Sequence, residues 1–323
     1  MKKLVYYLKQ IIMNLRNVNR LLMLILLTGV LAASCKKDEP EPVQPDSSSV
    51  QQLSRDDSSV EENIDEALID AGQVLAGKGS MEKAGLPCNV IVDSMYMSGD
   101  TVIYHLTYQG LNCIKTRYRS GTVLIKIREN TQWYLPGAFF MMEFYNYAVT
   151  NVYSGKKMTL NGMARLENVS GGVIELLGHG ITTVIHKNLA HLDIAFNGHP
   201  PRDWHLTRLQ AYSGVPGELV LAVNGFGTAQ GYNNLVSWGT DRDGQKFYTQ
   251  ITESVVFRET CYWLPWGGKQ VYDIPAQKLK ATVTFGYNDN NEPIGFNECP
   301  TRYRIDWQQN SQTGTIFLPL VNP

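Results

Sequence analysis

The sequence lacks the short motifs by which many enzymes and nucleotide-binding proteins are identified. It contains no Gly-x-Ser-x-Gly nucleophile elbow, no His-Glu-x-x-His, no Cys-x-x-Cys, no phosphate-binding loop and no Gly-x-Gly-x-x-Gly. The glycines of Gly225-Phe226-Gly227, followed by Gly231, have the wrong spacing for a dinucleotide site and indicate a bulge or a turn. We therefore predict a protein that is not an enzyme and that uses no cofactor.

A basic excess is also missing. The chain has 29 Lys and Arg against 30 Asp and Glu, for a formal net charge of −1. Proteins that bind nucleic acid carry clustered positive charge, so the composition argues against a nucleic-acid partner. Hydrophobic residues make up 43% of the chain, which predicts a folded body rather than a disordered one.

The apolar run near the N-terminus is short. It extends from Leu21 to Ala33, whereas a membrane-spanning helix needs roughly 20 residues. Five basic residues and no acidic residue precede its end at Leu31-Ala32-Ala33-Ser34-Cys35, a pattern typical of a signal peptide. We predict that residues 1–34 are a lipoprotein signal peptide and that Cys35 is the lipid-attachment residue. The alternative is a structural helix that happens to end in a cysteine.

The residues after Cys35 bear on where the protein is located. An acyl chain on Cys35 would attach the protein to a membrane by burying methylene groups in it. The segment Lys36-Lys37-Asp38-Glu39 resembles the surface-export signal of lipoproteins from Bacteroidota-type bacteria. We therefore expect an outer-membrane lipoprotein at the cell surface. Attachment facing the periplasm is the alternative.

A tether and a short helix are predicted next. Residues 35–57 are rich in Pro, Ser, Gln and acidic residues, which predicts a disordered tether. Over residues 58–79 we predict a short amphipathic helix, in which Ser59 and Glu62 form a capping box and Gly77 ends the helix. Its apolar residues recur at helical spacing, so this face should dock on the rest of the protein. Because its polar face is acidic, a helix lying on the membrane is the less favoured alternative.

From about Cys88 onward the hydrophobic pattern changes to a period of two. Alternate residues are apolar in Thr101–Tyr108 and in Gly121–Ile127, and turn signals such as Asn161-Gly162 and Asp243-Gly244 separate such runs. Short runs rich in Val, Ile, Thr and Tyr between turns are typical of antiparallel strands. No strong helical pattern recurs, which argues against βαβ units. We predict an all-β protein with an antiparallel β-sandwich-like body.

Short segments of the sequence repeat in the same order. Cys113 is followed by Thr-Arg-Tyr-Arg, as is Cys299, and a Gly-Thr pair at Gly121 and at Gly314 follows in each case. We interpret this as two related β modules; the alternative is convergent strand composition. The predicted parts are β module 1 over 86–172, a middle β region over 173–260 and β module 2 over 261–323.

Four cysteines remain beyond Cys35. In the oxidising envelope they can pair, and four cysteines allow three connectivities. Each repeat contains two of them, which favours a bond from Cys88 to Cys113 and a bond from Cys261 to Cys299. This pairing is a prediction from the repeat.

The order of these features resembles a family of uncharacterised Bacteroidota-type surface lipoproteins, with a lipobox, a tether and duplicated β modules. The matching segments are Leu86-Pro87-Cys88, the segment that ends at Cys113, Arg119–Val123, Asn146-Tyr147, Gly162–Asn168 and the closing Cys299 segment. The region 174–210 departs most from the family pattern. The resemblance implies no assigned activity and no catalytic residue, so no functional residue is carried over.

The histidines and two acidic turn segments are candidate ligands for a metal ion. Most of the 6 histidines lie between His179 and His205, and histidine is the commonest transition-metal ligand. However, His186 and His191 are five apart and would face opposite sides of a strand. Asp241–Gly244 resembles part of a calcium loop but lacks the downstream bidentate acid, and it fits a hairpin turn. We predict solvated or core histidines and no metal site.

Two tryptophans give the best indication of a binding surface. Trp263 and Trp266 follow Cys261 closely, near a turn. Exposed aromatic rings form stacking surfaces for sugars and proteins, so these residues are candidates for ligand stacking; the alternative is that they cap the end of the core. We predict a non-enzymatic lipoprotein, either a binding or a structural module, that is attached to the membrane through its lipid and has an unknown envelope protein or a glycan as its partner. A glycan-binding accessory lipoprotein is the second hypothesis, and an envelope hydrolase is the third.

Overall fold

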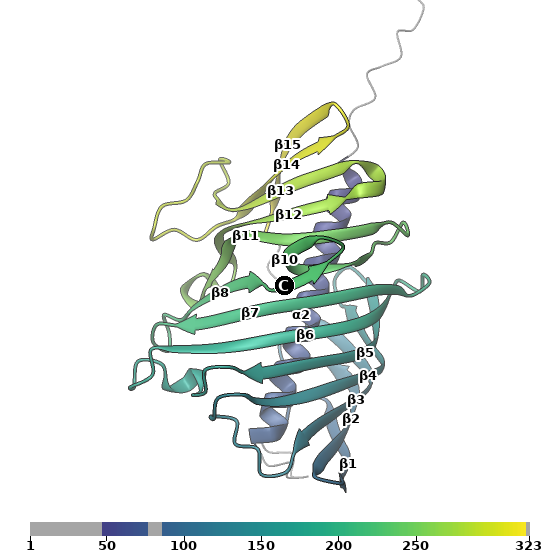
Figure 1. The fold of residues 1–323 in the computed structure, drawn as a ribbon, viewed down its shortest axis with the longest axis vertical. Coiled ribbons are helices and arrows are strands. Elements are labelled where there is room, and N and C mark those ends of the chain that lie inside the picture. Colours follow the sequence, from purple (N-terminus) through teal and green to yellow (C-terminus); the bar gives the residue numbers. More distant parts are fainter. Residues whose placement is uncertain (1–46, 77–85, 321–323) are drawn as a thin grey trace, which may run out of the picture. The chain divides into compact units, whose positions relative to one another are not determined.

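Helix α2 (Ser48–Ala76) opens the described part of this computed structural model, which comprises residues 47–76 and 86–320 (Figure 1). The helix begins at Ser48 and not at residue 58, so residues 48–57 are helical rather than part of the tether. The reason is that Val50 and Leu53 are buried and extend the apolar stripe of the helix toward its start. The predicted signal peptide, Cys35 and the rest of the tether lie outside the described residues.

Fifteen strands and three short 3₁₀ helices follow. They are β1 (Val90–Ser98), β2 (Thr101–Leu111), β3 (Arg117–Arg128), β4 (Ala138–Asn151), β5 (Lys157–Asn168), η1 (Ile174–Leu176), β6 (Thr183–Phe196), β7 (Arg202–Ser213), β8 (Val220–Gly225), β9 (Gly227–Ala229), β10 (Tyr232–Thr240), β11 (Lys246–Arg258), η2 (Glu259–Cys261), β12 (Pro265–Ile274), η3 (Pro275–Gln277), β13 (Leu279–Tyr287), β14 (Arg302–Gln309) and β15 (Gln312–Pro319).

The strands form one continuous antiparallel sheet. Its order is β1 to β7, then β10 to β15, so that strand order follows chain order; β8 pairs with β7 and β11, and β9 pairs with β10. The prediction of an antiparallel all-β protein is confirmed, but the strands do not divide into the two facing sheets of a sandwich. Because most strands pair with their neighbours in sequence, the strands within the predicted parts 86–172, 173–260 and 261–323 are consecutive strands of the same sheet.

Helix α2 supplies the second layer of the fold. Figure 1 shows it crossing the strands, and its apolar residues belong to the same buried cluster as residues of the sheet from β1 to β14. A sheet must cover its apolar face with another element, and here one helix does so. The prediction that the apolar face of the helix docks on the sheet is therefore confirmed. The helix residues in this cluster are Val50, Leu53, Val60, Ile64, Ala67, Leu68, Ala71 and Val74.

The acidic residues of α2 also contact the sheet. Arg242, in the turn between β10 and β11, donates hydrogen bonds from Nε and Nη2 to the two oxygens of Asp56, each at 2.6 Å. Such paired charge offsets the cost of removing a carboxylate from water. The other ion pairs of α2 join Glu61 and Asp65 to Arg208, Glu62 and Glu66 to Arg117, and Glu66 and Asp70 to Arg119.

Among the described residues, no helix carries an apolar stretch long enough to cross a membrane.

The two disulfides occupy equivalent places in the sheet. Cys88 lies just before β1 and bonds to Cys113 in the connection between β2 and β3. Cys261 lies just before β12 and bonds to Cys299 in the loop between β13 and β14. The predicted pairing is therefore confirmed. In each case the bond joins the chain entering a hairpin to the loop that leaves the hairpin.

The structural correspondence between the two repeats ends after the first strand beyond each disulfide. The Thr-Arg-Tyr-Arg segments begin β3 and β14. Gly121 then lies in β3 itself, whereas Gly314 lies in the next strand, β15. The matched Gly-Thr pairs therefore occupy different positions in the sheet.

Candidate functional site

Aromatic residues lie close in sequence to both cysteines of the Cys261–Cys299 disulfide, and two of them, Trp266 and Phe296, are in contact, with ring centres 6.1 Å apart. The bond joins the connection between β11 and β12 to the long loop between β13 and β14, which Figure 1 shows projecting beyond the sheet at the left of the view. We define the aromatic cluster as Tyr262, Trp263, Trp266 and Phe296, together with Arg258.

Three rings of the aromatic cluster are exposed. Tyr262 is 80% exposed, Phe296 is 73% exposed and Trp263 is 40% exposed. Single exposed apolar residues are common, but large apolar side chains gathered at one place mark interaction sites. The exposure of these three rings therefore makes the cluster a candidate binding surface.

The backbone beneath two of these rings has a rare conformation. Tyr262 and Trp263 have φ values of 56° and 58°, in the left-handed region that costs a non-glycine residue about 1–2 kcal/mol. Among the described residues they are the only aromatic residues with positive φ; the other non-glycine residues with positive φ are Asn, Lys and Gln. Hydrogen bonds from Tyr262 N to Glu259 O and from Trp263 N to Arg258 O, each 3.0 Å long, hold this turn. Strain of this kind, held by its surroundings, is common at functional sites.

Arg258 ties the two halves of the aromatic cluster together. Its guanidinium carbon lies 3.7 Å from the ring centre of Trp266 and 4.4 Å from that of Phe296, within the range of cation–π contacts. Arg258 Nη1 also donates a hydrogen bond to the carbonyl of Phe296 at 2.7 Å, and Trp266 Nε1 donates one to the carbonyl of Glu298 at 3.0 Å. The loop that carries Phe296 is therefore fixed to β11 and β12 by these bonds and by the disulfide.

The two tryptophans that the sequence grouped have different environments. Trp263 presents its ring to solvent, whereas Trp266 is engaged by Arg258 and by the carbonyl of Glu298. Phe296 was not predicted from the sequence, because it lies far from both tryptophans in the chain. The predicted disulfide could have identified it, since Cys299 is close in sequence and bonds to the residue beside Tyr262.

One group of residues could hold a metal ion in the part of the chain that the structure describes. His191 of β6 and His205 of β7 each place Nε2 near Asp203 Oδ1, at 3.0 and 3.2 Å. The spacing of the histidines along single strands did not predict this pair, because its members lie on two neighbouring strands. The Asn197-Gly198 turn was the signal, because residues equidistant from Gly198 pair in the hairpin. Partial burial lowers the pKa of His205, against the opposing effect of Asp203.

His186 illustrates the core histidine that the sequence favoured. It is buried between the rings of Trp133 and Tyr212, each with its centre 5.5 Å away. Burial lowers the pKa of His186 to about 4 because the charged form is poorly solvated there. This side chain is therefore neutral at physiological pH.

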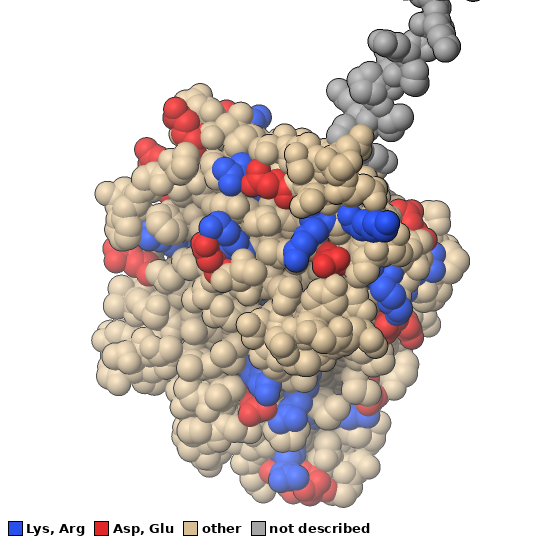
Figure 2. Space-filling view, turned by 45° about the horizontal axis from the view of Figure 1, so that its top comes forward, with Lys and Arg blue, Asp and Glu red and all other residues tan. Residues whose placement is uncertain are grey.

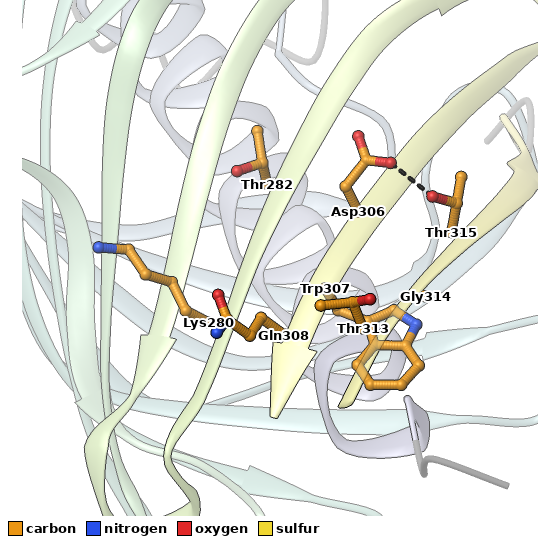
Figure 3. A pocket seen from close by; sticks show the side chains of 8 residues that line it. All are labelled: Lys280, Thr282, Asp306, Trp307, Gln308, Thr313, Gly314 and Thr315. Atoms are coloured by element: carbon orange, nitrogen blue, oxygen red, sulfur yellow. Dashed lines mark hydrogen bonds between the residues drawn. The ribbon is translucent and has the colours of Figure 1, made fainter. Parts of the chain in front are cut away.

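A depression of about 360 Å³ lies over β13, β14 and β15 (Figure 3). Its one carboxylate, Asp306, accepts a hydrogen bond from Thr315 Oγ1 at 2.7 Å and from Arg304 Nε at 2.8 Å. Both oxygens are therefore engaged within the sheet, and we do not assign a function to this depression. The lining residues are Lys280, Thr282, Asp306, Trp307, Gln308, Thr313, Gly314 and Thr315.

Charged residues of both signs are interspersed on the face shown in Figure 2. No broad area of one sign stands out among the described residues on this face. Charge alone therefore does not single out a binding surface in this view, and the exposed aromatic rings remain the stronger candidate.

A comparison with protein-family models, curated proteins and solved structures found no match to this chain. The resemblance to Bacteroidota-type lipoproteins stays a prediction.

Proposed function

We propose that this protein is a lipid-anchored lipoprotein of the cell surface that acts by binding and not by catalysis. In this proposal its ligand is a glycan and its binding surface is the aromatic cluster. The observation that carries the proposal is the pair of adjacent aromatic residues, Tyr262 and Trp263, held exposed by a left-handed backbone.

Rigid presentation of the rings supports a role in binding. Aromatic side chains offer a large contact area at a low cost in conformational entropy, and immobilising them before binding lowers that cost further. The disulfide, the hydrogen bond from Arg258 Nη1 to the carbonyl of Phe296 and the turn at Tyr262 all restrict the cluster. A ligand would therefore meet a surface that is already ordered.

A glycan fits this surface because a sugar ring has an apolar face and a polar edge. The apolar face can stack on an exposed ring, such as Trp263 or Phe296. Asn297 and Glu298, which follow Phe296 in the chain, are exposed. Their polar side chains can form hydrogen bonds with the hydroxyl groups of a sugar. An envelope protein that inserts apolar side chains between the same rings is the alternative ligand.

The anchoring part of the proposal is supported by the sequence alone. The lipobox at Leu31–Cys35 supports attachment through Cys35, and the segment Lys36–Glu39 supports the cell surface. Together they would present the aromatic cluster to ligands outside the cell.

Retention on immobilised glycans tests the ligand and its site. We expect Trp263→Ala and Phe296→Ala each to weaken retention about tenfold or more, because truncating a central aromatic contact costs roughly 2 kcal/mol. Tyr153→Ala is the matched control: Tyr153 is 81% exposed but lies in the turn between β4 and β5. Unchanged retention by both cluster variants would exclude the aromatic cluster as the glycan site.

Two further measurements test the anchor and the absence of catalysis. Cys35→Ser should abolish incorporation of labelled palmitate, and protease added to intact cells should cleave the wild-type protein while a periplasmic control survives. Protection from the protease would place the protein on the periplasmic side. Hydrolysis of an ester, peptide or glycan by the purified protein would favour the envelope hydrolase instead.

A further inference from the structure

A second surface, on the face of β6 and β7 opposite α2, carries two histidines and an aspartate side by side. We infer that His191, Asp203 and His205 form a binding site for a divalent transition-metal ion of the zinc class. The inference is independent of the aromatic cluster, because it depends on other residues of the sheet.

The register of the β6–β7 hairpin brings these three side chains together. His191 pairs directly with His205, and Asp203 precedes His205 by two residues, so all three lie on one face of the sheet. Their neighbours Leu192 and Trp204 point the other way, into the core that contains α2. The candidate ligands therefore stand on regular strands and not on loops, which favours a fixed geometry.

The distances suit a tetrahedral metal. Nitrogen and oxygen ligands lie about 2.0–2.2 Å from zinc, which places neighbouring ligand atoms roughly 3.3 Å apart in a tetrahedron. Asp203 Oδ1 lies 3.0 Å from His191 Nε2 and 3.2 Å from His205 Nε2. All three ligand atoms lie within 4.8 Å of one another. Small side-chain rotations would direct them toward one ion.

The chemistry of the donors selects the class of ion. Two imidazoles and one carboxylate suit zinc and the neighbouring divalent metals, whereas calcium and magnesium prefer sites made of oxygen. Three protein ligands leave at least one position open for water or for a group of another molecule. The site would therefore present the metal to the outside.

Neighbouring side chains hold the ligands in place. The ring of His205 stacks on Trp238 with the ring centres 4.9 Å apart and an interplanar angle of 3°. On its other side His205 stacks on His191, at 4.2 Å. Lys246 Nζ lies 3.7 Å from Asp203 Oδ2, whereas both histidines contact Oδ1. This outer layer restricts the rotation of His205 and of Asp203, as the residues around a metal site commonly do.

The chain contains its own control for this site. His105 of β2 contacts Asp93 of β1, with Nδ1 3.0 Å from Oδ2. Within the described residues this pair is not part of a group of three candidate metal ligands. A histidine–aspartate contact alone therefore differs from the proposed site by one ligand.

Titration of the purified full-length protein with Zn²⁺, followed by calorimetry, tests the inference. We expect saturable binding of one ion per chain and a loss of affinity of at least tenfold in His191→Asn and in His205→Asn. His105→Asn should bind as the wild type does. The side chain of His191 is 62% exposed, so His191→Asn remains informative if His205→Asn fails to fold.

Fluorescence locates the bound ion. Cu²⁺ bound beside Trp238 should quench its emission, and Trp238→Phe should remove that quenching while calorimetric binding persists. Absence of saturable Zn²⁺ binding, or equal affinity of wild type and His191→Asn, would overturn the inference. Quenching that persists unchanged in Trp238→Phe would also overturn it, because the ion would then lie elsewhere.

Discussion

Arg119 of β3 donates a hydrogen bond from Nη1 to Asp70 Oδ2 of α2 at 2.5 Å, and its side chain is only 2% exposed. The same nitrogen lies 3.3 Å from Glu66 Oε1, and Nη2 donates to the carbonyl of Cys88 at 2.9 Å. One buried side chain therefore joins the helix, a strand and the residue that carries the first disulfide.

Arg119→Met should destabilise the protein by about 3–5 kcal/mol, because it leaves the buried carboxylate of Asp70 without a counter-charge, whereas Glu66 keeps Arg117. Urea unfolding followed by circular dichroism measures the loss. Arg128→Met is the control: Arg128 pairs with Asp100, both side chains are 70% exposed, and such pairs contribute about 1 kcal/mol or less. Equal losses in the two variants would contradict the special role of Arg119.

The contribution of Glu61 and Asp57 to the stability of the protein should fall as pH rises from about 5 to 8. Burial raises the pKa of Glu61 to about 8, although Arg208 opposes this, and burial raises the pKa of Asp57 to about 6. The folded state thus binds protons that the unfolded state, with an ordinary glutamate pKa of 4.5, has released. The part of the free energy of unfolding that comes from these two groups therefore decreases across this window. Glu61→Gln should make the decrease shallower, as measured by urea unfolding at each pH.

Glu143 provides a comparison of opposite sign. Burial raises the pKa of Glu143, but hydrogen bonds from Lys126 and Tyr145 outweigh this effect and lower it. Its contribution is therefore present at neutral pH and is lost as pH falls through the lowered pKa. Glu143→Gln should destabilise the protein at pH 7 and matter less in acid. A Glu61→Gln profile as steep as that of the wild type would refute the assignment for Glu61.

Removing either disulfide should cost stability, but only one removal should affect ligand retention. The double variant Cys261→Ser, Cys299→Ser opens a loop with a sequence separation of 38, and Cys88→Ser, Cys113→Ser opens one of 25. Each should lose about 3–4 kcal/mol in the chain-entropy account. Only the first should weaken glycan retention, because Cys299 lies in the loop that carries Phe296. Equal glycan retention by both double variants would show that the aromatic cluster does not need the Cys261–Cys299 disulfide to bind.

Two glycines should respond to alanine in opposite directions. Gly72 is exposed within α2 and a Cβ there would meet no atom within 4 Å, so Gly72→Ala should stabilise the protein by about 0.5–1 kcal/mol. Gly121 has φ of 104°, and a Cβ would lie 2.2 Å from the carbonyl oxygen of Asn146. Gly121→Ala should therefore destabilise by about 1–3 kcal/mol or more. The midpoint of thermal unfolding should rise in Gly72→Ala and fall in Gly121→Ala. Midpoints equal to that of the wild type would contradict both predictions.

Local patterns of sequence predicted the elements of the fold well. Period-two alternation identified strands such as β2 and β3, the helical spacing from Val60 onward identified the docked face of α2, and the repeat predicted both disulfides. Alternation says that one face of a strand is buried, but not whether a second sheet or a helix covers it. The arrangement of the strands in a single sheet could therefore not be predicted from the local sequence pattern.

Contacts between distant residues account for what the sequence did not predict. The composition of residues 48–57 resembles a linker, and their helical state depends on burial of Val50 and Leu53 against the sheet. Asp57 receives a hydrogen bond from Tyr272 OH, at 3.3 Å, across most of the chain. His191 and His205 become neighbours only when the register of the β6–β7 hairpin is known.

The match between strand order and chain order determines how the chain can assemble. Successive hairpins need only nearby residues, so the sheet can grow one strand at a time, and local contacts of this kind favour fast folding. Helix α2, by contrast, precedes every strand, and its acidic residues find their arginines only in β3, in β7 and finally at Arg242 after β10. During synthesis the helix sequence therefore emerges before the strands and turns that supply its arginines. A chain that stopped before β10 would lack Arg242, the partner of Asp56. The last contacts of the helix therefore depend on a part of the chain that is made late.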